Sequence, residues 1–302
     1  MSISLYNLKE WYRMLTGRSV LHVNQDIGKS FEVGEIKGYY NNLTEKVTME
    51  PVLLTNEKLP KFEAESGKTV FFPVAIFQYG LGAYDLYLQT SENKYLNKFN
   101  QCVEWAMANQ EESGAWSNFF FVYKDDPYGA MCQGEGASLL LRAYKETNDE
   151  KYLEAAKRAI AFMLKDVKSG GTTYYDGEDV ILLEYTHLKP VMNGWIFALW
   201  GLYDFNIVSS DEENINIYKK TLNSLIKYLP SFDGKYWSMY DLSGKIASPF
   251  YHNLHIAQMQ AMYRITGEKT FEHYAEKWEK DSKSKIKKMR AFVKKAIQKI
   301  AE

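Results

Sequence analysis

The stretch PVMNGWIFALWGLYDF, residues 190–205, decides the fold, because it is apolar on nearly every side and begins with proline. Proline suits the first position of a helix, since the N–H that it lacks would have no partner there. A helix that is apolar all round is buried on every side. The run after Pro190 has about 15 residues and carries Asn193 and Asp204, so it is too short to cross a bilayer and predicts a core helix.

Three further segments repeat this pattern, roughly every 55 to 62 residues. They begin at Pro73, Pro127 and Pro249, and each leads through a short polar turn to a second helix with one apolar stripe and one charged face. The second helices are predicted at 92–108, 148–164, 211–229 and 267–281. Repeats of this length are typical of stacked or circular arrays. Inner apolar helices with outer amphipathic partners predict a mainly α fold, an incomplete α/α toroid of four helical hairpins.

The connections between the hairpins are rich in aromatic residues and glycine. Residues 114–126, 170–189 and 232–245 carry alternation and Gly-containing turns that predict short β-hairpins. All three lead from an outer helix back to the next inner helix, so they emerge on one face of the toroid. Loops gathered at one end of a rigid scaffold are where binding and catalytic sites are usually built.

The chain divides into three predicted parts. Residues 1–70 alternate at 22–36 and 46–54 and predict an N-terminal arm with short strands, laid on a toroid at 71–282. Residues 283–302 predict a basic amphipathic helix.

Composition excludes several classes of function. A formal net charge of −1 gives no reason to expect a nucleic-acid partner. Cys102 and Cys132 lack metal or redox spacing and are interpreted as small core residues of a reducing compartment rather than a disulfide. The start of the chain, MSISLYNLKEWYRML, shows no secretion signal, so we expect a cytoplasmic protein. The 23 Tyr, 16 Phe and 7 Trp belong largely to the core, but they also suit a groove that stacks on sugar rings.

The loop end of the toroid should collect polar side chains, which a cavity explains better than a dry core. The candidates are Gln78, Gln133, Glu135, Glu184, Tyr185, Asn193, Tyr240, Asp241, Tyr251, His252 and His255. Glu184 could be a loop acid or helix-cap partner, or half of a proton-transfer pair with Tyr185. His252 and His255 have HxxH spacing, but no third ligand is evident, so no metal is expected. The sequence contains no Ser-His-Asp elbow, P-loop or dinucleotide fingerprint, so no cofactor is expected either.

Four motifs in order carry a resemblance to a known family. They are FFPVAIFQYGLGAYDLYL, YGAMCQGEGASLLLRAYKETND, LLEYTHLKPVMNGWIFALWGLYDF and YDLSGKIASPFYHNLHIAQMQ, which span most of the chain between about residues 71 and 280. This order resembles the C-terminal domain of D-glucuronyl C5-epimerases. The resemblance implies inversion at C5 of a uronic acid within a polysaccharide, of the D-glucuronate to L-iduronate type found in heparosan and glycosaminoglycan biosynthesis.

The resemblance also implies roles for particular residues. Glu184 and Tyr185 match an acid/base pair on one side of the sugar, and Tyr251 matches the catalytic group opposite. Tyr240 matches the tyrosine of the family's Tyr-Asp-Leu stretch. The further candidates for substrate binding are His252, His255, Asn193, Gln133, Gln78, Tyr79, Trp116, Tyr39 and Lys245.

Two departures from the family pattern bear on the substrate. Animal members have an arginine after Tyr-Asp-Leu that would neutralise the substrate carboxylate, whereas Ser243 stands here. His252, Lys245, Lys189 or His187 could substitute for it. The β-rich domain that precedes the toroid in animal members is reduced to the N-terminal arm, so the glycan could be shorter or differently decorated.

Three other functions remain open. A polysaccharide lyase shares the C5 proton abstraction but then expels the C4 substituent. A glycoside hydrolase needs two carboxylates, for which Glu184 with Glu135 or Asp241 is a loose candidate. A non-catalytic glycan-binding toroid is the third.

The C-terminal helix has its own alternatives. Eight basic residues between Lys283 and Lys299 accompany an apolar side that includes Ile286, Val293 and Ile300. The helix could dock on the toroid, join two subunits as a homodimer, or lie on the inner membrane surface as a peripheral anchor.

Overall fold

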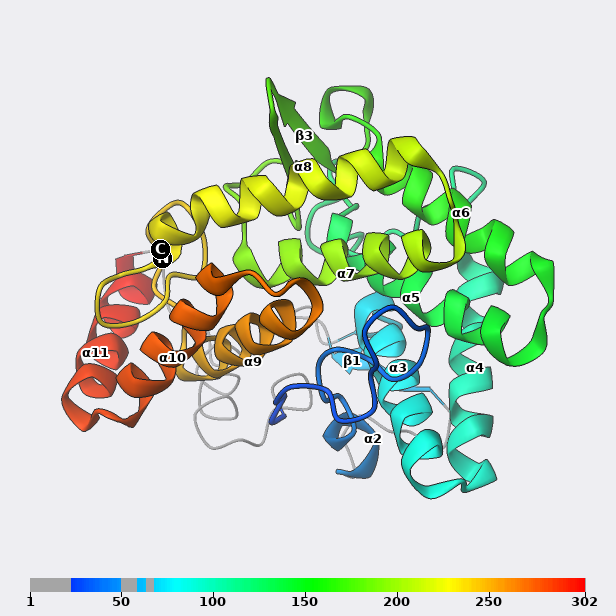
Figure 1. Cartoon of the computed structure of the whole chain (residues 1–302), viewed down its shortest axis with the longest axis horizontal. Helices are drawn as coiled ribbons and strands as arrows, with labels where there is room; N and C mark the ends of the chain where they lie inside the picture. The colour runs from blue at the N-terminus through cyan, green and yellow to red at the C-terminus, as the bar shows by residue number, and fades with distance from the viewer. Residues whose placement is uncertain (1–22, 50–58, 64–67, 302) are drawn as a thin grey trace.

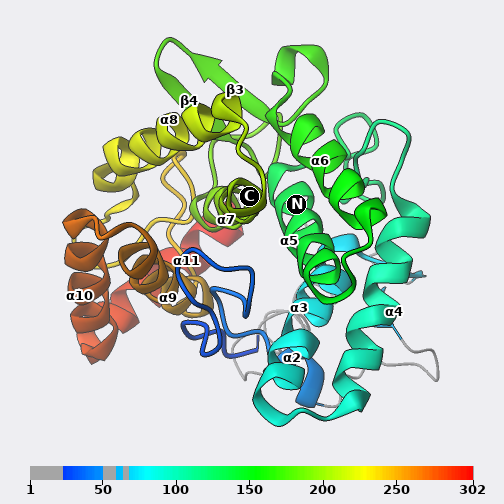
Figure 2. The same ribbon diagram turned by 45° about the vertical axis from the view of Figure 1, so that its right-hand side comes forward.

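The computed structural model describes residues 23–49, 59–63 and 68–301, and in them it contains four consecutive helical hairpins. In each hairpin an inner helix precedes an outer one. The pairs are α3 (Pro73–Thr90) with α4 (Asn93–Asn109), α5 (Ala130–Thr147) with α6 (Glu150–Leu164), α7 (Met192–Val208) with α8 (Glu212–Tyr228), and α9 (Pro249–Thr266) with α10 (Lys269–Lys283). Figure 2 shows the inner helices side by side and the outer helices around them. The predicted α/α toroid of four hairpins is confirmed.

The turns from inner to outer helices use recurring capping interactions. Helices α3, α5 and α9 each finish at a residue in the left-handed region, namely Ser91 (φ 58°), Asn148 (φ 53°) and Gly267 (φ 74°). Each of these donates its N–H to the carbonyl of a tyrosine four residues earlier, which satisfies one of the free carbonyls at the helix end. The following outer helices α6 and α8 begin after Asp149 and Asp211, whose carboxylates accept backbone N–H groups of the first turn.

Proline marks the start of only two of the inner helices. Pro73 and Pro249 are the first residues of α3 and α9, as predicted. The predictions at Pro127 and Pro190 are wrong by a few residues, because α5 begins at Ala130 and α7 at Met192. The carbonyls of these two prolines accept N–H groups from neighbouring loops, which keeps both residues in extended segments.

Close packing of α5 against α7 forms the centre of the core. A Cβ atom built on Gly201 of α7 would lie 2.4 Å from the Cα of Gly134 in α5, so the two backbones touch. Trp195 and Trp200 of α7 are fully buried beside this contact. Cys102 and Cys132 are also buried, and neither forms a disulfide. Within the described residues, no helix is both long and apolar enough to span a bilayer.

The described part of the N-terminal arm, residues 23–49 with α2 (Glu45–Thr48), packs against the C-terminal ends of the inner helices, away from the loops that join one hairpin to the next. A buried ion pair anchors it, because Arg142 Nη1 lies 2.7 Å from Asp204 Oδ2 and Arg142 Nη2 donates to the carbonyl of Gly38 (3.0 Å). The Tyr40 phenol donates to the same aspartate, and the Tyr39 N–H donates to Asp85 Oδ1 (2.9 Å). The arm therefore closes one end of the toroid and leaves the loop end for a site.

The strand predictions are met only in part. The hairpin expected within 170–189 is present, as β3 (Thr173–Asp176) paired antiparallel with β4 (Asp179–Leu182) around Gly177. Residues 114–126 instead form turns and bends, and residues 232–245 make only isolated bridges. Within these loops short-range hydrogen bonds replace a ladder, such as Tyr123 N–H to the Phe119 carbonyl (2.8 Å) and Tyr240 N–H to the Lys245 carbonyl (2.6 Å).

In the arm, the strand predicted from residue 46 is wrong over residues 46–48, which belong to helix α2. The remainder of that prediction, 50–54, lies outside the described residues, as does His22. Residues 23–36 make one isolated bridge, between Ile27 and Asn41. A short ladder joins β1 (Phe62–Glu63) to β2 (Thr69–Val70) just before the toroid.

The remaining elements are two 3₁₀ turns and the C-terminal helix. The turns are Val167–Ser169 and Leu229–Phe232, which follow outer helices α6 and α8. The predicted C-terminal helix is present as α11 (Lys285–Ala301), which follows α10 directly (Figure 1).

Candidate active site

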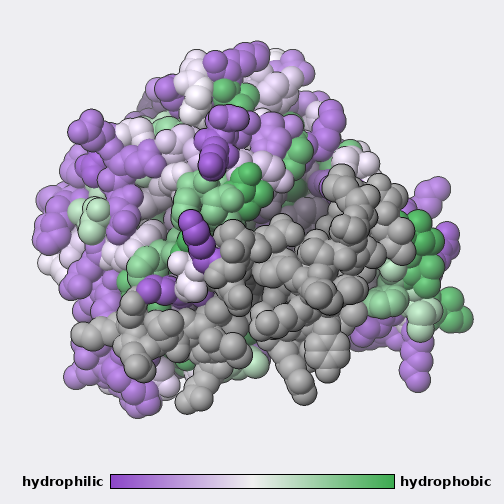
Figure 3. All heavy atoms as spheres, turned by 180° about the vertical axis from the view of Figure 1, so that it is seen from behind, coloured by the Kyte–Doolittle hydropathy of each residue, from purple (hydrophilic) through white to green (hydrophobic). Residues whose placement is uncertain are grey.

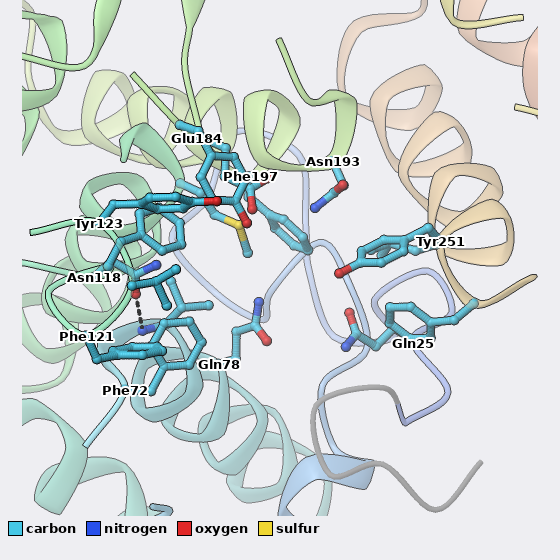
Figure 4. Close-up of a pocket in the computed structure, with 17 residues that line it drawn as sticks. Gln25, Phe72, Gln78, Asn118, Phe121, Tyr123, Glu184, Asn193, Phe197 and Tyr251 are labelled. Carbon is cyan, nitrogen blue, oxygen red and sulfur yellow. Dashed lines mark hydrogen bonds between the residues drawn. The ribbon is translucent and has the colours of Figure 1, made fainter. Parts of the chain in front are cut away.

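A polar cavity of about 320 Å³ lies where the inner helices begin. Its volume is at the lower end of the range of small-molecule sites. Its lining combines an aromatic wall, which includes Phe72, Phe119, Phe121 and Phe250, with polar groups from every inner helix except α5 and from the loops between them (Figure 4). The polar lining residues are Gln25, Gln78, Asn118, Tyr123, Glu184, Tyr185, Asn193 and Tyr251.

Glu184 reaches the cavity because two glycines leave room for its segment. A Cβ on Gly129 would lie 2.2 Å from the Glu184 carbonyl oxygen, and a Cβ on Gly194 would lie 2.3 Å from Glu184 Oε2. The segment is held in place by the N–H of Ala130, which donates to the carbonyl of Leu183 (2.8 Å). The Glu184 side chain therefore lies against the first turn of α7.

The environment of Glu184 favours the protonated acid. Burial raises the pKa of this carboxyl to about 8, and a hydrogen bond with the Tyr185 side chain partly opposes the shift. Only 8% of the residue is exposed, and its Oε2 atom has no hydrogen-bond partner among the described residues. A carboxyl that is buried, aimed at a cavity and poised near neutral pH is suited to acid–base chemistry.

Three tyrosines extend from Glu184 around the cavity. Tyr240 packs edge-on against Tyr251, with ring centroids 4.8 Å apart, and its phenol forms hydrogen bonds with those of Tyr185 and Tyr251. Tyr185 stacks on Phe119 at 4.5 Å. Burial raises the pKa of all three phenols, so they are neutral donors at ordinary pH. A continuous chain of hydrogen-bonding groups thus joins Glu184 to Tyr251.

A second buried carboxyl lies behind the cavity wall. Glu135 of α5 accepts a hydrogen bond from Gln78 Nε2 (2.8 Å), and the bond orients Gln78 at the cavity. Burial raises the pKa of Glu135 to about 8, and burial lowers the pKa of Lys46 in α2 to about 8, although the two charges attract each other. Glu135 is itself fully buried and is not part of the lining.

Amide side chains supply the remaining polar groups. Asn118 Oδ1 accepts the N–H of Val74 (3.3 Å), the bond drawn in Figure 4. Gln258 Nε2 donates to the Asn193 carbonyl (3.2 Å), and Asn193 Oδ1 has no partner within the described ranges. Asn193 points its side chain toward the cavity from the start of α7.

The structure brings together all three catalytic candidates predicted from the sequence. Glu184, Tyr185 and Tyr251 line one cavity with Gln78 and Asn193. Tyr240 lies directly behind Tyr251 and Tyr185.

Several predicted substrate-binding residues do not line the cavity. Gln133 bonds the backbone of Trp116 from both its amide atoms, and the Trp116 indole donates to the Ala106 carbonyl. Tyr79 follows Gln78 on α3, so it turns about 100° away from the cavity and accepts a hydrogen bond from Lys98 of α4. Tyr39 is fully buried against Phe197 and Trp200 of α7.

The two histidines are buried and are not part of the cavity lining. The Nδ1 atoms of His252 and His255 both lie 2.8 Å from Ser238 Oγ, and His252 Nε2 lies 3.1 Å from the Trp278 carbonyl. Burial lowers the pKa of His252 to about 3 and also lowers that of His255, so both are neutral. In the part of the chain that the structure describes, no group of three His, Cys, Asp or Glu residues could hold a metal ion.

The substitutes proposed for the family arginine do not line the cavity. Ser243 donates its hydroxyl to Asp241 Oδ1 (2.6 Å), and the Lys245 N–H bonds the same oxygen. Neither Lys189 nor His187 is part of the lining, although His187 packs on the lining residue Tyr123 at 4.6 Å. Among the described lining residues there is no Lys, Arg or His, so neutral donors surround the cavity.

Sequence reasoning missed the contribution of residues 118–123. Asn118, Phe119, Phe121 and Tyr123 line the cavity, whereas the sequence predicted only a hairpin there. The run of three phenylalanines within this loop was the available signal, because a loop seldom needs so much apolar surface unless it covers a site. Gln25 of the arm was also missed, since nothing local distinguishes it from other arm residues.

The fold and the cavity define a protein of the α/α toroid class with a buried carboxyl and several tyrosines around a cavity at its loop end. The family model described as "D-glucuronyl C5-epimerase C-terminus" matches residues 123–280, and the chain belongs to this family.

Two curated proteins and one solved structure are similar to this chain. An uncharacterized protein of Methanocaldococcus jannaschii is 33% identical over 156 residues, which cover 50% of this chain and 51% of that protein. The D-glucuronyl C5-epimerase of Caenorhabditis elegans is 26% identical over 214 residues, which cover 61% of this chain and 35% of the worm protein. The chain therefore spans about half or less of these curated relatives. The structure of cellobiose 2-epimerase from Bacillus thermoamylovorans is similar with a TM-score of 0.51 at 14% identity, covering 91% of this chain and 68% of that one, which shows the shared fold.

Proposed function

We propose that the protein is a C5-epimerase of uronic acid residues in a polysaccharide. The observation that carries this proposal is the entry of Glu184 and Tyr251 into one cavity from separate parts of the fold, the segment after β4 and the start of α9. Inversion at C5 needs a proton acceptor on one face of the sugar and a proton donor on the other. Family membership supports the same reaction.

In the first step Glu184 is the general base. Its ionised carboxylate takes the C5 proton, and the C–H electron pair moves into the neighbouring C6 carboxyl to give an ene-diolate. Hydrogen-bond donors held in fixed positions around the cavity stabilise this charge. The amide N–H groups of Asn193 and Gln25 and the Tyr185 phenol are the donors that the cavity offers.

The second step assigns the acid to Tyr251. Its phenol gives a proton to the opposite face of C5, which completes the inversion and leaves a phenolate beside Tyr240. The reverse reaction exchanges the two roles.

The tyrosine chain gives Tyr240 a task in turnover. After one inversion Glu184 is protonated and Tyr251 is ionised, so the site cannot repeat the same direction until a proton returns. The hydrogen bonds from Glu184 to Tyr185, Tyr240 and Tyr251 provide that route without the need for bulk water.

Nuclear magnetic resonance of candidate uronic acid polymers in heavy water tests the proposal. Epimerisation places deuterium at C5 without chain cleavage. A product with near-ultraviolet absorbance would instead identify a lyase, and binding without exchange would identify a glycan-binding toroid. The Tyr185→Phe variant should lose exchange while it keeps glycan affinity, because the ring that stacks on Phe119 remains.

A further inference from the structure

Helix α11 is attached to the toroid along the side that carries Ala291 and Gln298. On that side Ala291 is 1% exposed, and the Gln298 side chain accepts the N–H of Ile246 and donates to the Gly244 carbonyl, both at 2.9 Å. Lys295 lies over the ring of Tyr240, with its ammonium 5.6 Å from the centroid. The helix is therefore docked on the loop that carries Tyr240.

The opposite side of α11 presents large apolar residues to solvent. Ile286 is 82% exposed, Met289 63%, Val293 49% and Ile297 61%. Intervals of three and four residues place them in one stripe along the helix. Figure 3 shows apolar surface at the rim of the molecule that α11 occupies in Figure 1. Single exposed apolar residues are ordinary, but a contiguous stripe marks an interaction surface.

Basic residues border this stripe on both edges. Residues 285–301 contain seven lysines and arginines and no acidic residue. At 100° per residue, Lys285 falls along one edge of the stripe, with Lys288 a further 60° around the helix, and Arg290 and Lys294 fall along the other edge. A groove of about 890 Å³ runs between the stripe and Tyr236, whose ring lies 4.1 Å from the Arg290 guanidinium.

We propose that α11 lies on an anionic lipid surface, with its apolar stripe at the boundary between headgroups and acyl chains. The two basic edges then face negatively charged headgroups, and the docked side faces the toroid. Pairing with a second copy through the same stripe would bring two helices together that each carry seven positive charges and no negative one, which is unfavourable. The charge pattern therefore selects lipid over self-association. This inference is independent of the reaction at the cavity.

Sedimentation of the full chain with vesicles tests the proposal. We expect binding to vesicles of phosphatidylcholine with about one-third phosphatidylserine, weaker binding as salt is raised, and none to phosphatidylcholine alone. Replacing Lys285, Lys288 and Lys294 with glutamine should weaken binding about 100-fold at low salt, or about five-fold for each charge. The matched control replaces Lys145, Lys157 and Lys219, exposed lysines of α5, α6 and α8, and should bind like the unaltered protein.

A second variant tests the apolar stripe. Ile286→Ser, Val293→Ser and Ile297→Ser combined should lower vesicle binding by at least about 100-fold, while the helix content measured by circular dichroism stays unchanged. Serine at Val33, Leu188 and Val208, which are exposed outside α11, is the control and should have no effect. Equal binding to neutral and anionic vesicles, or equal loss in the controls, would overturn the proposal. So would a dimer that the serine variant abolishes in a protein that binds no vesicles.

Discussion

Exchange at C5 should rise with pH between pH 6 and pH 8, because Glu184 must be ionised to accept the proton. Burial raises the pKa of this carboxyl to about 8. The ionised fraction is then about 1% at pH 6, about 10% at pH 7 and about half at pH 8. At substrate concentrations well below KM, the initial rate of deuterium entry should increase about tenfold over the first pH unit and about fivefold over the second.

Two variants separate Glu184 from its buried neighbour. Glu184→Gln should lower the exchange rate by about 100-fold or more and remove the rise with pH, since an amide neither ionises nor accepts the proton. Glu135→Gln is the matched control, because burial raises the pKa of Glu135 to about 8 too, yet that residue does not line the cavity. Its profile should keep the rise. A flat or falling profile in the unaltered protein, or a rate in Glu184→Gln close to normal, would refute this assignment.

The raised pKa of Glu184 makes the exchange rate rise with pH, but it makes the stability of the fold fall with pH. The folded-state pKa of Glu184 lies above its ordinary value of 4.5, so the folded protein binds more protons. The stabilisation that this proton gives to the folded state is complete below about pH 4.5 and is lost as pH rises through about 8. The free energy of unfolding of Glu184→Gln, minus that of the unaltered protein, should therefore be larger at pH 9 than at pH 5. The increase should be on the order of 4 kcal/mol. Urea unfolding at the two pH values measures the difference, and an equal stability difference at both would contradict the burial argument.

Three further substitutions test the site and its support. Tyr251→Phe should reduce exchange by about 100-fold, the scale of a lost general acid, with the glycan affinity retained in a binding assay. Tyr240→Phe should leave the first inversion in a single-turnover experiment nearly intact and slow only repeated turnover, whereas equal loss in both would remove the relay. Gly201→Ala should lower the free energy of unfolding by several kcal/mol, because its Cβ would meet the backbone of Gly134, which cannot move aside as a side chain could. An unchanged urea midpoint would contradict the close contact of α5 and α7.

Local features of the chain were enough to predict the four hairpins and the end of the toroid that holds the site. Apolar inner helices and striped outer helices follow from side-chain periodicity, which each segment carries within itself. The place of Glu184 could be predicted in the same way, because every loop after an outer helix must return to the same face.

The sequence could not show which side chains share the cavity, because the rotation of each inner helix about its axis is not specified by any local pattern. Gln78 and Tyr79 are adjacent in the sequence, yet one faces the cavity and the other faces α4. Tyr251 and His252 divide in the same way, since His252 turns to Ser238 and Trp278. Both members of each pair are polar enough to serve a site, so composition alone could not choose between them.

Only the tertiary structure decided two features of the protein. They are the raised pKa of Glu184 and the position of the arm that closes the toroid. The sequence determined that a carboxyl stands at the loop end. Its pKa depends on burial against α7. This burial requires the glycine at 194, and it exists only in the folded chain. The alternation in the arm suggested strands, whereas its described residues are held by Arg142, Asp204 and Asp85 of three inner helices. Periodicity is a property of neighbouring residues and can be read from the chain. Desolvation and long-range hydrogen bonds arise between distant segments, and they exist only once the helices have packed.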